Sequence, residues 1–407
     1  MEEKKKKIII LIIIIILVLL VSGIILILSL PPKVDNTLFT LKKDLNIPVY
    51  CKQTVKDCIE SIDGKVITNK KINTEELGKQ EVSFIYENLE GKKRTGTFTV
   101  KVVDVEEPLI WLSGSYSVQV GTELDLAKAV LCADNYDSNP ICKIEGEYDL
   151  NTAGTYPLTY VATDSSKNEE RVDFNLYVYE PAPPTTEEEP AEEPVRTAFH
   201  EVVANYKNEN TEIGIDVSKW QGEIDFKKVK QAGASFVMIR VGAQQGVGGK
   251  YILDDYFKQN IENALKNDLK VGIYFYSYAD SLKEAKKQAN WVLKQIKDYD
   301  ITLPIAFDWE CYNNFNEMEL SLFGLNEVAE TFLDRIEEKG YDGMLYGSKN
   351  YLNSIWKYHE YDVWLAHYTN ETDYDSEYVM WQLCQDGQID GINTPVDINV
   401  LYKNKED

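Results

Sequence analysis

The chain has 407 residues, of which 44% are hydrophobic and 27% are charged, an ordinary globular composition for two to four domains. Its net charge of −24 argues against a nucleic-acid-binding protein, which normally carries a basic face. The acidity does not identify a substrate, because much of it lies in a linker and on predicted helix surfaces.

The N-terminal segment is the clearest compositional signal. Four lysines, Lys4–Lys7, precede an almost purely aliphatic run from Ile8 to Leu30. As a helix this run is roughly 35 Å long, enough to cross the ~30 Å core of a bilayer. We therefore expect residues 1–33 to be a cytoplasmic basic segment and a transmembrane anchor in the cell membrane, with everything after Pro31 outside the cell. The alternative is a cleaved signal peptide, which would make the protein secreted.

Residues 34–105 and 106–180 show the same pattern of short alternating strands, so they predict two all-β sandwiches from one internal repeat. The second copy resembles the immunoglobulin-like modules of bacterial surface proteins through VQVGTELDL and AGTYPLTYVATDSSKNEERVDF. Such modules are usually spacers, and specific ligand binding is the alternative. We interpret the acidic stretch at 133–139 as a solvated turn rather than a metal site.

The six cysteines fit an exported protein. Cys51 and Cys58 occupy a similar place in the first module to Cys132 and Cys142 in the second, which favours two short local disulfides. Cys311 and Cys384 belong to the last domain, where spacing alone does not show whether they pair.

Residues 181–205 form a Pro- and Glu-rich linker, which we expect to be extended and semi-rigid. From 206 to 407, strands alternate with amphipathic helices. The helices are expected over residues 253–268, 281–298 and 325–340, the last ending on Gly340. The strands are expected at residues 213–218, 236–242, 271–278, 303–310, 343–348, 362–368, 379–383 and 397–402. Eight strands with helices predict an irregular (β/α) TIM-like barrel, with its active site at the C-terminal strand ends.

The stretch PIAFDWECY places Asp308 and Glu310 at such a strand end. Residues i and i+2 of a strand share one face, with Cα atoms about 6.6 Å apart. Paired carboxylates suit glycoside hydrolysis, which needs an acid for the leaving oxygen and a second carboxylate for the oxocarbenium-like centre. A lone D-x-E is a weak signal. It gains weight because Asp216 ends the first strand and Asp397 begins the last.

The C-terminal domain, residues 206–407, resembles a known family. The motifs GIDVSKWQG, VMIRVG, GIYFYSYA, PIAFDWE, DVWLAHY, MWQL and VDINV occur in the order found in glycoside hydrolase family 25, the lysozymes or N-acetylmuramidases. The match covers about residues 211–402. The resemblance implies an irregular barrel that hydrolyses the β-1,4 bond between N-acetylmuramic acid and N-acetylglucosamine in peptidoglycan glycan strands, with retention of configuration and with no metal and no cofactor.

The resemblance also assigns roles by position. Glu310 would be the general acid, with a pKa raised by burial and neighbouring acids. Asp308 would be the nucleophile or would orient the substrate's 2-acetamido group, and the resemblance favours this substrate-assisted route. Asp216 and Asp397 would hold the pair and tune its charge. Further candidates for substrate contact are Arg240, Tyr276, Trp364 and Tyr368.

Two alternatives to a muramidase are compatible with the sequence. One is a non-catalytic cell-wall-binding surface protein, in which the barrel grips glycan while the β-modules make contacts. The other is hydrolysis of chitin-like polymers by a similar barrel. A muramidase held at the membrane would act on nearby wall, in remodelling or lysis.

Overall fold

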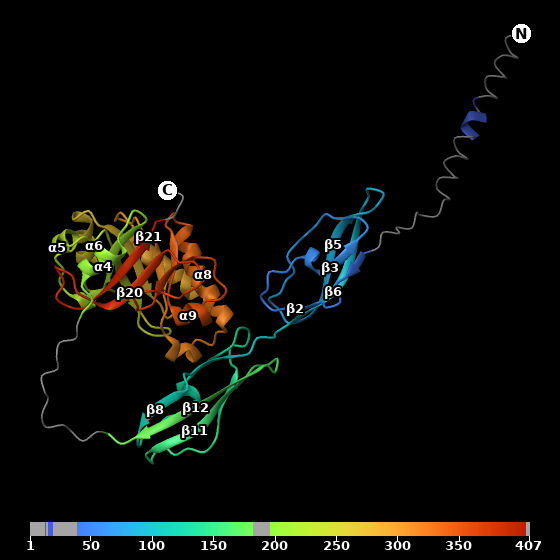
Figure 1. The fold of residues 1–407 in the computed structure, drawn as a ribbon. Coiled ribbons are helices and arrows are strands. Elements are labelled where there is room, and N and C mark those ends of the chain that lie inside the picture. Colours follow the sequence, from blue (N-terminus) through green and yellow to red (C-terminus); the bar gives the residue numbers. More distant parts are fainter. Residues whose placement is uncertain (1–12, 14, 19–38, 182–195, 404–407) are drawn as a thin grey trace, which may run out of the picture. The chain divides into compact units, whose positions relative to one another are not determined.

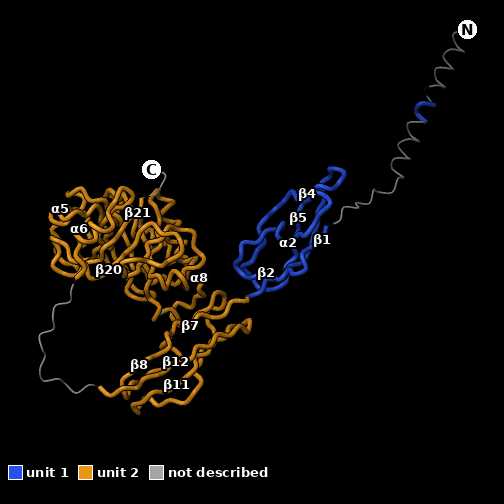
Figure 2. Tube along the Cα trace, viewed as in Figure 1, with its two compact units in different colours: residues 1–104 blue, residues 105–407 orange. Residues whose placement is uncertain are grey.

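The computed structural model describes residues 13, 15–18, 39–181 and 196–403 (Figure 1). The predicted fold class included a transmembrane helix in residues 1–33, and this part of the prediction is corrected. Among the described residues, no helix is long and apolar enough to cross a membrane. Most of the aliphatic run and the linker residues 182–195 lie outside the described part of the chain. The chain divides into two compact units, residues 1–104 and 105–407 (Figure 2).

The first unit is a small β-structure with two sheets. The ten- and eleven-residue strands of its central hairpin, β5 and β6, alternate in burial and place Val82, Phe84 and Val100 in one apolar core. The four-stranded sheet has the order β2 (Asn46–Pro48), β6 (Lys93–Val103), β5 (Gly78–Glu87), β4 (Lys65–Val66), and the second sheet pairs β1 (Phe39–Leu41) with β3 (Ile59–Ile62), which follows α2 (Val55–Cys58).

The disulfide predicted between Cys51 and Cys58 is absent, because both residues are free thiols. Cys58 lies at the end of α2 in the apolar core, whereas the Sγ of Cys51 donates to Oε1 of Gln53 at 3.9 Å. Cys51 packs against the same apolar core but forms no bond with Cys58.

The second unit begins with a β-module of the same size. Its four-stranded sheet has the order β10 (Ile141–Glu145), β11 (Gly154–Thr163), β12 (Glu169–Tyr179), β8 (Ser115–Gln119); a two-stranded sheet pairs β7 (Leu109–Trp111) with β9 (Leu131–Ala133), and α3 (Leu126–Ala129) precedes β9. The predicted disulfide between Cys132 and Cys142 is confirmed, and it joins the two sheets. Each module has six described strands, one fewer than the seven of the smaller immunoglobulin type, so the immunoglobulin-like label is not confirmed.

A closed eight-stranded barrel follows, and it contains every strand predicted after residue 206. Six parallel pairings run from β13 to β20, and β21 is antiparallel to both of its neighbours, β20 and β13. The strands are β13 (Thr211–Val217), β14 (Phe236–Gln244), β16 (Lys270–Tyr276), β17 (Ile305–Asp308), β18 (Gly343–Ser348), β19 (Asp362–Ala366), β20 (Met380–Gly387) and β21 (Val396–Tyr402), with β15 (Tyr251–Leu253) as a hairpin partner of β14.

The helices around the barrel include all three predicted ones, α6 (Phe257–Lys266), α7 (Leu282–Ile296) and α8 (Leu322–Glu337). Gly340 has a φ of 82°, which suits the predicted glycine after α8. The last strands follow one another without long helices between them, as expected for an irregular barrel. The shorter helical elements are α4 (Phe199–Tyr206), η1 (Lys219–Gln221), α5 (Phe226–Gln231), η2 (Tyr312–Glu317) and α9 (Lys349–Ser354).

The barrel strands are buried on both faces, and their alternate residues belong to two different apolar layers. On β14, Phe236 and Met238 belong to the apolar cluster that also includes Met344 and Met380, whereas Val237 and Ile239 belong to the larger cluster that includes helix residues. Because successive side chains of a strand point to opposite faces, Arg240 continues the inward set at the end of this filling. The apolar side chains thus fill the interior of the barrel, and polar side chains that point inward lie at the C-terminal end of β14.

Candidate active site

The first and last barrel strands bring two predicted acids together. Asp216 near the end of β13 is the Cα partner of Asp397 near the beginning of β21. Because β21 runs antiparallel to the other strands, its N-terminal end lies at the same barrel mouth as their C-terminal ends. Residues 181 positions apart in the sequence therefore face one another across a single strand pair.

The other two acids lie on the opposite part of the same mouth. Asp308 is the last residue of β17 and is the register partner of Tyr276 on one side and Tyr346 on the other. Glu310 follows two residues after Asp308, beyond the end of the strand. Asp308 is buried, whereas the side chain of Glu310 is still reached by solvent.

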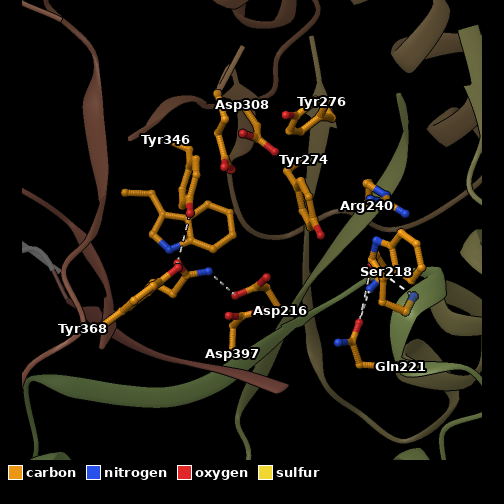
Figure 3. A pocket seen from close by; sticks show the side chains of 14 residues that line it. Asp216, Ser218, Gln221, Arg240, Tyr274, Tyr276, Asp308, Tyr346, Tyr368 and Asp397 are labelled. Carbon is orange, nitrogen blue, oxygen red and sulfur yellow. Dashed lines mark hydrogen bonds between the residues drawn. The ribbon is translucent and has the colours of Figure 1, made fainter. Parts of the chain in front are cut away.

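A cavity of about 220 Å³ lies at this mouth and is lined by all eight site residues predicted from the sequence (Figure 3). Figure 3 shows Asp308 and Tyr276 at one side of the cavity and Asp216 with Asp397 at the other. The six further lining residues are Ser218, Trp220, Gln221, Tyr274, Tyr346 and Gln382. The cavity is therefore walled by carboxylates, aromatic rings and amides, a combination suited to a polyhydroxylated ligand.

Asp308 and Glu310 form a strongly coupled acidic pair. Burial raises the pKa of Asp308 well above its ordinary value, and the nearby charge of Glu310 raises it further, against an opposing effect of Arg240. Desolvation also raises the pKa of Glu310, because protein atoms shield the carboxyl group from bulk water although the cavity mouth is open. The two carboxyl groups interact directly, and this interaction contributes to the raised pKa of Asp308. The pair therefore keeps a proton at a pH where isolated carboxyls have lost theirs.

Asp216 is held in its charged form by two amides. Oδ2 of Asp216 accepts a hydrogen bond from Nε2 of Gln382 at 2.9 Å and another from Nδ2 of Asn399 at 2.8 Å. Burial raises the pKa of Asp216 to about 6, and these two donors keep it from rising further. Burial raises the pKa of Asp397 to about 9, and the charge of Asp216 contributes to that rise. Near neutral pH the pair therefore carries one charge and one proton.

Each amide is oriented by groups that bind its oxygen. The hydroxyls of Tyr346 and Tyr368 donate to Oε1 of Gln382 at 3.0 and 3.1 Å, and Nε1 of Trp364 donates to Oδ1 of Asn399 at 2.8 Å. Because each amide oxygen is occupied by a donor, each NH2 group faces Asp216. The ring of Trp364 is only 1% exposed, so this residue forms part of the cavity wall behind Asn399.

Arg240 lines the cavity but is committed to an ion pair. Its Nε and Nη2 donate to Oδ2 of Asp254 at 2.9 and 2.7 Å, and the side chain of Asp254 is fully buried. Oδ2 of Asp254 also accepts the backbone N–H of Lys219, which precedes the cavity residue Trp220. The pair thereby fixes the β13 exit loop while its guanidinium lowers the pKa of Asp308.

The residues that sequence reasoning missed are mainly uncharged. Gln382 and Asn399 lie in the motifs MWQL and VDINV, and Trp220 and Gln221 lie in GIDVSKWQG, but none of them carries a signal of its own. Tyr346 follows from topology, since it is the register partner of Asp308 on β18. A search for amides one strand away from each predicted acid would have found Gln382 and Asn399.

A second hollow of about 290 Å³ adjoins the first and shares Trp220, Arg240 and Tyr276 with it. The ring of Trp220 is 70% exposed and lies at the boundary of the two hollows. Together they form a trough longer than the acidic cavity, which suits an extended substrate.

The two cysteines of the barrel do not pair. Cys311 and Cys384 are both buried free thiols. Sγ of Cys311 donates to the backbone oxygen of Ser277 at 3.3 Å, which ties the residue after Glu310 to the strand end of β16. Cys311 therefore acts as a buried link behind the acidic pair.

Comparison with known proteins assigns this barrel to a family. The profile of Glycosyl hydrolases family 25 matches residues 215–392. The YegX protein of Escherichia coli is 30% identical over 213 residues, which cover 51% of this chain and 74% of that protein. The chain belongs to glycosyl hydrolase family 25.

Two further proteins similar to this family 25 hydrolase are named for related activities. The autolytic lysozyme of Clostridium acetobutylicum is 26% identical over 191 residues, covering 46% of this chain and 54% of that protein. The solved structure of a family 25 glycosyl hydrolase from Bacillus anthracis has a TM-score of 0.43 and 22% identity, and covers 49% of this chain and 93% of the other. As a member of family 25, the chain is a glycoside hydrolase of the lysozyme type.

Proposed function

We propose that this enzyme cleaves the β-1,4 bond between N-acetylmuramic acid and N-acetylglucosamine in peptidoglycan, with retention of configuration. The observation that carries the proposal is the pair of Asp308 and Glu310 at the end of β17, which lines the cavity and has raised pKa values. A protonated carboxyl beside a second carboxyl is the arrangement that glycoside cleavage requires.

Glu310 is the general acid in this proposal, because it is the member of the pair that solvent and substrate reach. It gives its proton to the glycosidic oxygen as the C–O bond breaks. The carbonyl oxygen of the substrate's own 2-acetamido group attacks the anomeric carbon from the opposite face and forms a cyclic oxazolinium intermediate. Water then opens this ring while Glu310 takes a proton back, so the configuration is retained.

Asp308 orients the acetamido group and stabilises the positive charge that develops on it. It is buried and lies next to Tyr276 and Tyr346 in the sheet, so its carboxyl group has little freedom to move. Direct attack by Asp308 on the anomeric carbon is the competing route. The resemblance of the barrel motifs to family 25 favours the substrate-assisted route, with Asp308 beside the acid Glu310.

The charged Asp216 with the protonated Asp397 faces this pair across the cavity. A fixed negative charge there opposes ionisation of Glu310 and favours a positive charge at the reacting sugar. The adjoining trough along Trp220 accommodates further sugars of the glycan strand, since an exposed ring face can stack on a sugar.

We also propose that the enzyme works outside the cytoplasm, on the cell wall, in remodelling or lysis. The disulfide between Cys132 and Cys142 supports this location, because such bonds persist in oxidising compartments.

Mass analysis of the muropeptides released by the whole chain tests the activity. The wild type is expected to release fragments with N-acetylmuramic acid at the reducing end, and Glu310→Gln is expected to release at least about 10³-fold less. Products ending in N-acetylglucosamine, or equal release by the variant, would contradict the assignment. Cleavage of an N-acetylglucosamine homopolymer at a comparable rate would instead favour a chitin-type substrate.

A further inference from the structure

The β-module of residues 105–180 is joined to the barrel by backbone hydrogen bonds. The N–H of Leu322 donates to the carbonyl of Asp134 at 2.7 Å, and the N–H of Phe323 donates to the carbonyl of Asn135 at 3.2 Å. Leu322 and Phe323 open α8, where the first N–H groups of a helix have no partner within it. Asp134 is 1% exposed, so the stretch at 133–139 is in part a docking loop and not the solvated turn expected from the sequence.

Apolar side chains and a charged residue extend the same contact. Leu131 and Ala133 of β9 are buried within the cluster that forms the outer core of the barrel. Glu106 contacts two barrel residues, since Oε1 accepts the hydroxyl of Tyr358 at 3.2 Å and Oε2 lies 3.8 Å from Nζ of Lys357. A spacer that hangs freely would leave these groups in water, so the expected spacer role does not describe this module.

Trp111, at the end of β7, contacts barrel residues close to the active site. Its ring is stacked on Tyr312, with 6.2 Å between centroids and 13° between planes, and meets the ring of Tyr351 edge-on at 4.9 Å. Tyr312 begins η2, two residues after Glu310. The hydroxyl of Tyr351 donates to the backbone oxygen of Glu310 at 3.4 Å. Trp111 of the β-module thus contacts both Tyr312 and Tyr351, the two aromatic residues next to the backbone of Glu310.

We propose that the second β-module is a fixed part of the catalytic unit and that Trp111 is a positioning residue for the segment that carries Glu310. This inference rests on the proposed role of Glu310 as the general acid. Glu310 lies beyond the end of β17, so the barrel sheet does not fix its backbone. Its carbonyl is held by Tyr351, and Trp111 packs against the ring of Tyr351 on the side of the module.

Removing the Trp111 ring leaves Tyr312 and Tyr351 without their common neighbour, so the segment from Glu310 to η2 gains freedom. A misplaced acid lowers the rate of proton donation more than it lowers substrate binding. We expect Trp111→Ala to lower kcat roughly tenfold with a KM within about twofold of the wild type. Because the carboxyl group also becomes more hydrated, the alkaline limb of the pH profile should move to lower pH.

Hydrogen exchange provides a readout that does not need activity. In the whole chain, Trp111→Ala should speed exchange of the backbone amides in 310–323, which include Leu322 and Phe323, while exchange in β14 and β16 stays unchanged and so reports a folded barrel. Tyr177→Ala is the matched control, since Tyr177 is an aromatic of the same module that is 41% exposed. Trp111→Phe, which keeps an aromatic ring, should recover most of the lost kcat.

The outcomes separate the two proposals. An inactive wild type contradicts the muramidase assignment, and the exchange data alone then decide whether the module holds the 310–323 segment. An active wild type whose kcat, pH profile and exchange are all unchanged by Trp111→Ala overturns the positioning role. A lower kcat with unchanged exchange in 310–323 overturns it as well, because the loss would then arise elsewhere.

Discussion

The indole Nε1 of Trp364 donates a 2.8 Å hydrogen bond to Oδ1 of Asn399, and this bond determines which end of the amide faces Asp216. The amide could otherwise rotate and present its oxygen to the carboxylate, replacing an attraction with a repulsion. A buried ring in the cavity wall therefore governs the charge of a neighbouring carboxyl group.

Replacement of Trp364 by Phe tests this relationship, because Phe fills much of the same space but donates no hydrogen bond. Asn399 loses its fixed orientation, so Asp216 loses a dependable donor and its pKa should rise above about 6. We expect the acid limb of the pH profile of kcat/KM to move to higher pH and kcat at pH 6 to fall about three- to tenfold. Trp381→Phe is the control, since Nε1 of Trp381 donates to the backbone oxygen of His367 instead.

The paired acids predict how activity depends on pH in the wild type. Asp216, with its pKa of about 6, is charged only above that pH, so activity should rise through pH 6. At higher pH the pair of Asp308 and Glu310 loses its remaining proton, so activity should fall again. A bell-shaped profile of kcat/KM is expected, and Asp216→Asn should remove its acid limb. A profile in Asp216→Asn with the wild-type acid limb would contradict this assignment.

Asp397 makes a separate prediction about stability. Its folded pKa of about 9 lies far above the ordinary value of about 3.9, so the folded protein binds this proton more tightly than the unfolded chain does. The stabilising effect is complete below about pH 4 and is lost progressively as the pH rises towards 9. Asp397→Asn cannot ionise, so its free energy of unfolding, relative to the wild type, should increase between pH 5 and pH 9. Chemical denaturation at several pH values measures this difference, and a pH-independent difference would count against it.

The ion pair between Arg240 and Asp254 should contribute to stability as well as to the site. Asp254→Asn keeps an acceptor but removes the charge opposite a largely buried guanidinium, so we expect a loss of about 2–3 kcal/mol in the free energy of unfolding. Asp255→Asn is the matched control, because the neighbouring carboxylate is exposed. Equal losses in the free energy of unfolding for the two substitutions, measured by denaturant titration, would show that the buried ion pair adds no stability of its own.

The disulfide of the second module closes a short loop, with a sequence separation of 10 between Cys132 and Cys142. Loop-closure entropy then predicts a loss of about 2.5–3 kcal/mol for the double variant Cys132→Ser/Cys142→Ser. Cys132 lies in β9, between Leu131 and Ala133, which pack against the barrel. The backbone amides of residues 133–135 should therefore also exchange faster in this variant. Cys51→Ser, which alters a free thiol, should show neither effect.

Much of the barrel could be predicted from the sequence because each strand carries an apolar run and the four acids lie at strand ends. The pairing of Asp216 with Asp397 depends on β21 running antiparallel, a long-range property that no local pattern encodes. The amides Gln382 and Asn399 were missed for a different reason. An amide gains its function from the group that orients it, and that group lies on another strand.

Similar residues in the two β-modules led to the opposite error. Cys51 and Cys58 occupy places like those of Cys132 and Cys142, yet they are thiols, because repetition in sequence does not guarantee that two sulfur atoms meet. The membrane span predicted from the aliphatic run at residues 8–30 is also corrected, since no spanning helix is found among the described residues and most of the run lies outside them.

The pairing of the first barrel strand with the last has a consequence for the biosynthesis of the enzyme. Asp216 is translated about 180 residues before Asp397, and the amide donors to Asp216 also come from β20 and β21. A nascent chain that has exposed only the earlier strands has neither a closed barrel nor a complete set of acids. On the roles proposed for these acids, the hydrolase is expected to gain activity only when its final strand has been added.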